Sequence, residues 1–187
     1  MTMKRAFLLH GVGGNDTDYF WFTDTKAYLD ANGYEVWWPA LPNPDRPRLD
    51  DSLYFLENNH PGMDEETILI GHSSACPLIL SFLQNAHTQV GQVVLVAGYY
   101  ERFEDNDISN AMLGTGYDWS AIRQSAKEII MINSDNDPWG CTDLYARNAM
   151  GKLHATMVVA TGQGHMGSDS FKQPYAEFPL LKRLLNV

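Results

Sequence analysis

Short apolar runs alternate with longer mixed segments along the chain. Six of these runs are rich in Val, Ile and Leu and end at a Gly, Pro, Asn or similar turn-forming residue; they cover residues 5–9, 34–38, 67–70, 92–97, 128–133 and 155–160. Most lack the strict alternation of a strand with one wet face. Continuous apolar runs are typical of strands covered on both faces, as in a parallel sheet between helices.

The segments between the runs have helical character. We predict helices over residues 22–32, 50–58, 75–85, 119–127, 142–153 and 175–185, the first ending at Gly33, a residue suited to a helix C-terminus. Strand and helix alternation with short connections predicts a three-layer α/β fold with a mostly parallel sheet of about six strands. Because no linker or repeat interrupts the pattern, we expect one domain over residues 1–187. Ligands bind such sheets at the carboxyl ends of the strands.

The run 67–70 leads into Gly71-His72-Ser73-Ser74-Ala75 and then a helix. This sequence fits the nucleophile elbow G-x-S-x-G, with Ala75 in the last position. Small residues on either side let strand and helix approach closely, so that the serine hydroxyl projects at the turn. The alternative is an ordinary turn in which Ser73 caps the helix. His72 only precedes the candidate nucleophile and receives no role.

Two further strand ends carry candidate partners for Ser73. Residues 134–138 supply Asp135 and Asp137 after the fifth run, and His165 ends a glycine-rich loop after the sixth. A carboxylate can fix the tautomer of a catalytic histidine. We prefer Asp137, because a residue before proline is biased towards an extended backbone, and expect Asp135 to cap its own turn. The alternatives are plain turn chemistry for the acids and no role for a lone loop histidine.

The loop after the first run reads His10-Gly11-Val12-Gly13-Gly14. It resembles the HG-x-G loop whose backbone faces a developing oxyanion in many esterases. We assign the oxyanion donors to the backbone N–H groups of Val12 and Ser74. A phosphate-binding loop is the weaker alternative, since the P-loop lysine and the G-x-G-x-x-G spacing are both missing.

Taken together, these motifs occur at four strand ends in the order Ser, Asp, His that α/β-hydrolases use. The sequence therefore predicts acyl transfer to water by Ser73, His165 and Asp137, with no cofactor and no metal.

The segments 67–74, 93–99 and 134–138 together resemble the small serine hydrolases related to retinoblastoma-binding protein nine. The resemblance covers nearly the whole chain and implies a compact hydrolase core without a large lid. It also implies Asp137, the acid before proline, as the triad acid. The chain departs from that family in three places: Ala75-Cys76-Pro77 after the elbow, the His10 loop, and Trp139-Gly140-Cys141 after Pro138.

Composition narrows the possible functions. The chain has 187 residues, with 13 Lys and Arg against 23 Asp and Glu and a net charge of −10, which disfavours binding to nucleic acid. No apolar run is long enough to span a bilayer, and the short apolar stretch near the N-terminus is followed by no cleavage site. We therefore expect a cytoplasmic protein with a small-molecule ester as substrate, and the sequence identifies no protein partner.

Two rival hypotheses remain at this stage. The chain could be a protein-binding module on a hydrolase fold with little or no catalysis, because a fold does not guarantee a function. Alternatively Cys76 is the nucleophile, although its place about one helical turn beyond Ser73 suggests that it faces the packing side. Several aromatic residues are candidates for lining the site: Trp21, Tyr99, Tyr100, Trp119 and Trp139.

Overall fold

A computed structural model describes residues 4–187. Its six strands form one sheet, in the order β2-β1-β3-β4-β5-β6, and every neighbouring pair is parallel. The strands are β1 (Lys4–Leu9), β2 (Tyr34–Trp37), β3 (Ile68–His72), β4 (Val90–Val96), β5 (Ala126–Asn133) and β6 (Thr156–Val159). The helices are α1 (Phe22–Ala31), α2 (Leu49–Asn59), α3 (Ala75–Leu83), α4 (Asp107–Asn110), α5 (Trp119–Gln124), α6 (Asp143–Leu153) and α7 (Pro179–Leu184).

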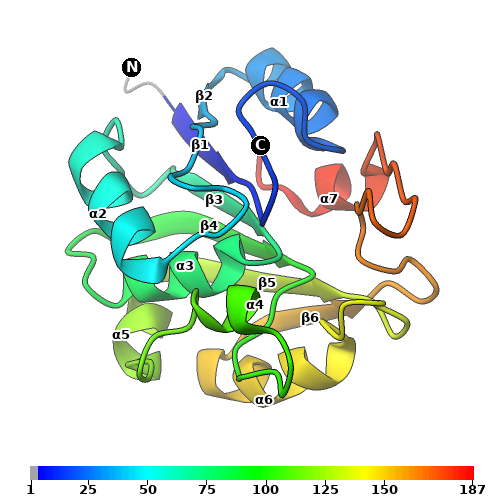
Figure 1. The fold of residues 1–187 in the computed structure, drawn as a ribbon. Helices are drawn as coiled ribbons and strands as arrows, with labels where there is room; N and C mark the ends of the chain where they lie inside the picture. The colour runs from blue at the N-terminus through cyan, green and yellow to red at the C-terminus, as the bar shows by residue number, and fades with distance from the viewer. Residues whose placement is uncertain (1–3) are drawn as a thin grey trace.

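Helices cover both faces of the sheet, which gives the three layers that the sequence predicts (Figure 1). One core contains Leu69, Leu95 and Met131 beneath α2, α3, α5 and α6. The other contains Ile70 and Val94 beneath α1 and α7. Successive strand residues point to opposite faces, so a strand between two cores must be apolar at every position. This explains the non-alternating runs.

Several details differ from the sequence prediction. The helix predicted over residues 119–127 ends at Gln124, and β5 already begins at Ala126. β6 is an edge strand whose side chains are exposed or half-buried, so it is not covered on both faces. The last helix begins at Pro179 instead of residue 175, because proline starts a helix readily and disfavours helical backbone just before it. The short helix α4 was not predicted, since four residues carry no periodic signal.

The carboxyl ends of the central strands lie side by side. His72 pairs in register with Val96, and Val96 pairs with Ile132. The turns that follow β3, β4, β5 and β6 therefore emerge at one edge of the sheet, and this edge brings the predicted site residues together.

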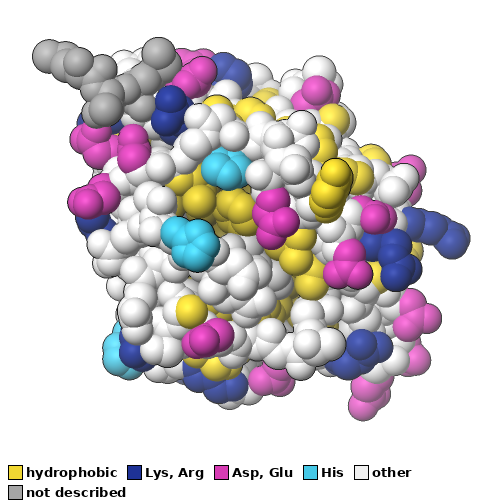
Figure 2. All heavy atoms as spheres, turned by 90° about the vertical axis from the view of Figure 1, so that its left-hand side faces the viewer, with side chains coloured by type: hydrophobic (Ala, Val, Ile, Leu, Met, Phe, Trp, Pro, Cys, Tyr) yellow, Lys and Arg dark blue, Asp and Glu magenta, His cyan; other side chains and the backbone are white. Residues whose placement is uncertain are grey.

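The molecular surface carries both hydrophobic and charged side chains. On the face that contains α2, hydrophobic side chains reach the surface in the middle, and dark blue and magenta charged side chains surround them (Figure 2). Among residues 4–187, no helix is long and apolar enough to cross a membrane.

Candidate active site

Ser73 occupies the sharp turn between β3 and α3. Its φ is +55°, a left-handed conformation that costs a non-glycine residue about 1 kcal/mol or more. The Ser73 N–H donates to the Val96 carbonyl at 2.9 Å, which holds the turn against β4. A Cβ at Gly71 would lie 2.6 Å from Ile79 Cδ1 and 3.3 Å from the backbone of Ala75, both on α3, so a larger residue would force a neighbour to shift. The strained serine and the close approach are the features of a nucleophile elbow.

His165 and Asp137 form the second part of the site. His165 Nδ1 lies 2.7 Å from Asp137 Oδ2, and the two side chains are 7% and 0% exposed. The other carboxylate oxygen, Oδ1, accepts the Trp139 N–H at 2.8 Å. The carboxylate is thus held from both sides, and it fixes the orientation of the imidazole.

The loop that carries His165 is held by the turn after β5. Gly162 and Gly164 both have positive φ, which their lack of a side chain permits. Asp135 Oδ1 accepts the Gly162 N–H, and Asn136 Oδ1 accepts the Gly164 N–H, each at 2.8 Å. The expectation that Asp135 caps its own turn needs correcting: its carboxylate caps the neighbouring loop. The two acids of this turn therefore lie in different environments.

Ser73 and His165 line one cavity of about 300 Å³, together with Val12. The rest of the lining is Gly13, Tyr19, Phe20, Asn106, Ile108, Ser109, Trp139, Cys141, Gly167, Ser168, Asp169 and Ser170. Within the described residues 4–187, no hydrogen bond joins Ser73 Oγ to the His165 imidazole. Hydrogen bonds between catalytic groups often tighten only when substrate binds.

The predicted oxyanion donors flank the serine. Val12 lines the cavity, and Ser74 is the N-cap of α3. No backbone carbonyl within residues 4–187 accepts from the N–H of either residue. With respect to the backbone of residues 4–187, both N–H groups are therefore free to donate to a ligand.

Sequence reasoning misjudged most of the aromatic residues near the site. Of the five candidates only Trp139 lines the cavity; Trp21, Tyr99, Tyr100 and Trp119 do not. Tyr19, Phe20 and Ile108 line it instead. Tyr19 and Phe20 lie in the connection between β1 and α1. Their closeness in sequence to the HG-x-G loop was the signal that could have placed them near the site. Ile108 belongs to α4, which no pattern revealed.

Cys76, the rival nucleophile, is fully buried on the first turn of α3. Its Sγ lies 3.4 Å from the carbonyl oxygens of Gly71 and Val96. Burial raises the pKa of the thiol, which disfavours the thiolate that nucleophilic attack requires. The structure therefore favours Ser73 over Cys76.

Asp137, Cys141 and His165 place three possible metal-ligating atoms within 4.8 Å of one another, all on buried residues. Two of these residues, Asp137 and His165, are already joined by a hydrogen bond between Oδ2 and Nδ1. A metal ion here would compete with the pairing that orients His165.

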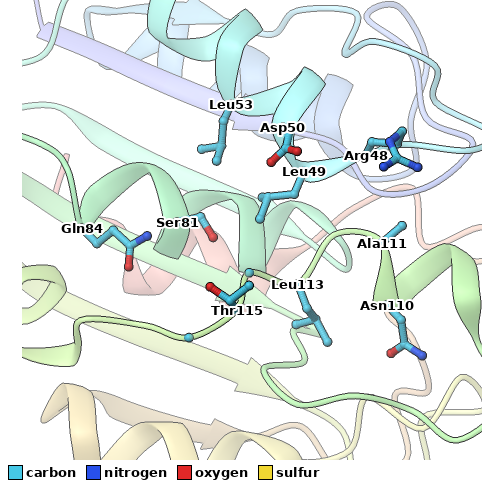
Figure 3. Close-up of a pocket in the computed structure, with 12 residues that line it drawn as sticks. Arg48, Leu49, Asp50, Leu53, Ser81, Gln84, Asn110, Ala111, Leu113 and Thr115 are labelled. Carbon is cyan, nitrogen blue, oxygen red and sulfur yellow. The ribbon is translucent and has the colours of Figure 1, made fainter.

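A second cavity, of about 410 Å³, lies between α2, α3 and the segment after α4 (Figure 3). Arg48 and Asp50 come from the start of α2, and Ser81 and Gln84 from α3. Although this cavity is the larger one, it contains none of the predicted site residues. Ser73, His165 and the donor residue Val12 all line the smaller cavity, which is therefore the candidate site.

Comparison with known proteins finds similar sequences among hydrolases. A sequence model described as serine hydrolase matches residues 6–186. The chain is 32% identical to the hydrolase-named protein YdeN of Bacillus subtilis (strain 168) over 136 residues, 72% of this chain and 71% of that protein. It is 25% identical to serine hydrolase RBBP9 of Rattus norvegicus over 172 residues, 90% of each chain.

The crystal structure of the B. subtilis ydeN gene product superimposes with a TM-score of 0.88 and 26% identity, covering 97% of this chain and 96% of that one. This match confirms the predicted α/β-hydrolase fold, and the family match confirms the predicted enzyme class. The protein is an enzyme that belongs to the serine hydrolase family.

Proposed function

We propose that the protein hydrolyses a small carboxylic ester through an acyl-enzyme, with Ser73 as nucleophile, His165 as general base and Asp137 as orienting acid. The observation that carries this proposal is the 2.7 Å hydrogen bond between Asp137 Oδ2 and His165 Nδ1. His165 lines the same cavity as Ser73, whose backbone is strained. An Asp-His pair beside a serine elbow is the arrangement that activates a hydroxyl.

The chemistry follows from this geometry. His165 Nε2 removes the Ser73 proton as Oγ bonds to the ester carbonyl carbon, and the carbonyl electron pair moves onto oxygen. Collapse of this intermediate expels the alcohol, which takes its proton from the His165 imidazolium. Water then attacks the acyl-enzyme by the same route and releases the acid and free Ser73. Asp137 stabilises the imidazolium in both halves without accepting its proton.

The negative oxygen of each intermediate needs donors. We assign this role to the backbone N–H groups of Val12 and Ser74, which flank Ser73 and have no backbone acceptor among residues 4–187. In enzymes of this kind the loss of one such donor raises the barrier by about 3 kcal/mol. Because both donors are backbone groups, the shape of the two loops maintains them.

The cavity supports a small, uncharged substrate. Its volume of about 300 Å³ lies at the lower end of the range for small-molecule sites. Phe20, Ile108 and Trp139 give it apolar walls, and Asp169 is the only Asp, Glu, Lys or Arg among the described residues that line it. A free carboxylate on the substrate would find no cationic side chain there and would meet a negative one. We therefore expect neutral esters with short acyl chains.

The test combines labelling and turnover. A fluorophosphonate probe is expected to label the wild type on Ser73, and p-nitrophenyl acetate and butyrate to be hydrolysed faster than the dodecanoate. Ser73→Ala should abolish both signals. Ser81→Ala is the matched control, because this buried serine lies on α3 but lines the second cavity. It should keep both signals.

Two results would contradict the proposal. Labelling and turnover that survive Ser73→Ala would place the nucleophile elsewhere. A folded wild type that neither labels nor turns over any ester would favour the protein-binding module on a hydrolase fold.

A further inference from the structure

His72, the residue before Ser73, is 0% exposed and makes a hydrogen bond with each ring nitrogen. Nδ1 lies 3.0 Å from Tyr19 Oη, and Nε2 lies 2.8 Å from the backbone carbonyl oxygen of His165. Neither contact is part of the mechanism described above. A buried imidazole with two partners on different loops is a candidate for a positioning role.

The partners determine where each proton lies. A carbonyl oxygen only accepts, so His72 Nε2 carries the proton and donates it to His165 O. The unprotonated Nδ1 then accepts the Tyr19 hydroxyl proton. The same hydroxyl oxygen accepts the Gly11 N–H at 3.1 Å. Three hydrogen bonds thus run in one direction, from Gly11 through Tyr19 and His72 to His165.

These bonds join the three parts of the proposed machinery. Gly11 precedes the oxyanion donor Val12, His72 precedes Ser73, and His165 is the base. A Cβ at Gly11 would lie 2.9 Å from both Ser73 Cβ and Tyr19 Oη, so the loop packs directly on the elbow and on the tyrosine. We infer that Tyr19 and His72 are positioning residues that hold the oxyanion loop and the backbone of His165 in register with Ser73. The inference rests on the proposed function.

The charge state of His72 agrees with this role. Burial, with a smaller effect of the neighbouring His165, lowers the pKa of His72 to about 3. The ring therefore stays neutral at neutral pH and keeps one donor and one acceptor. Its centroid lies 4.9 Å from that of His165. A second cation at this distance would oppose the imidazolium that forms during catalysis.

The first test is Tyr19→Phe against Tyr34→Phe. Both tyrosines are buried on the same side of the sheet, but Tyr34 Oη donates to Asn186 O, away from the strand ends that carry the site. Tyr19→Phe is expected to lower kcat about 10- to 100-fold with little change in KM, because small misplacements of reacting groups have effects of this size. Tyr34→Phe should leave kcat unchanged at a similar melting temperature. Equal kcat in the two variants would overturn the inference.

The second test replaces His72. His72→Gln retains an N–H donor for the His165 carbonyl, whereas His72→Leu retains only volume. We expect the glutamine variant to recover part of the kcat that the leucine variant loses. Equal kcat values in the two folded variants would contradict a positioning role for the hydrogen bond between His72 and the His165 carbonyl.

A third measurement is independent of turnover. Long-range ¹H–¹⁵N spectra of the histidine-labelled Ser73→Ala protein should show His72 as the neutral tautomer with its proton on Nε2. A proton on Nδ1 would overturn the inference even if ester hydrolysis is confirmed. The expected tautomer, found together with a folded wild type that hydrolyses no ester, would instead refute the proposed function alone.

Discussion

Replacement of Asp137 by asparagine changes one atom at the centre of the proposed site. In the wild type, Oδ1 accepts the Trp139 N–H and Oδ2 accepts the proton on His165 Nδ1. An asparagine must keep its oxygen towards Trp139, because its amide nitrogen cannot accept that N–H. The amide nitrogen then faces His165 Nδ1 and donates to it. His165 is forced to carry its proton on Nε2, where it can no longer accept one from Ser73.

The size of the effect follows from this change of tautomer. The corresponding substitution in a well-studied serine protease lowers kcat about 10⁴-fold, which corresponds to about 5.5 kcal/mol in the barrier. The matched control is Asp135→Asn. Asp135 is exposed and, among residues 4–187, accepts only the Gly162 N–H, and an asparagine oxygen can accept the same bond. We expect its kcat to stay within about threefold of wild type.

The assay measures kcat for both variants on p-nitrophenyl acetate, with melting temperatures to verify folding. Asp137→Asn should keep a near-native melting temperature, because its shape and both hydrogen bonds are retained. The reverse ranking of the two variants would refute the assignment of the acid. Two similar partial losses would show that the loop can exchange one carboxylate for the other, and this would refute the tautomer argument.

Two further predictions concern pH and metal ions. The folded-state pKa of His72 lies at about 3, below the unfolded value of about 6.5, so its contribution to stability is present above pH 6.5 and lost as the pH falls towards 3. Burial lowers the pKa of His10 in the same direction. The free energy of unfolding in urea should therefore fall with acid, by about 1.4 kcal/mol per pH unit for each proton, and less steeply in His72→Gln; equal slopes would contradict this account. Separately, Cd²⁺ should inhibit turnover reversibly, because Asp137, Cys141 and His165 offer ligand atoms within 4.8 Å of one another. Burial raises the pKa of the Cys141 thiol, so the ion must displace the thiol proton when it binds. Cys141→Ser should raise the half-inhibitory concentration about tenfold relative to its own uninhibited rate, and unchanged inhibition would exclude Cys141 as a ligand.

The sequence by itself determined the architecture and the identity of the main candidates. The apolar runs predicted all six strands, because a strand covered on both faces admits few polar residues. The local motifs predicted Ser73 and His165, since an elbow and a flexible loop each need small residues at fixed positions. The pairing of Asp137 with His165 was also expected, from the proline that follows the acid and from the family resemblance.

Tertiary structure decided the relations between segments that are distant in the chain. Tyr19 touches His72, and His72 touches His165, across separations of 53 and 93 residues, and no local pattern encodes such contacts. The role of Asp135 also differs from the sequence prediction, because its hydrogen-bond partner Gly162 belongs to another loop. The cavity walls were misjudged for the same reason: Phe20 and Ile108 line the cavity that contains Ser73 only after the sheet has aligned its strand ends. Periodicity and turn chemistry act over a few neighbouring residues, whereas a site is assembled by packing between segments that are distant in the chain.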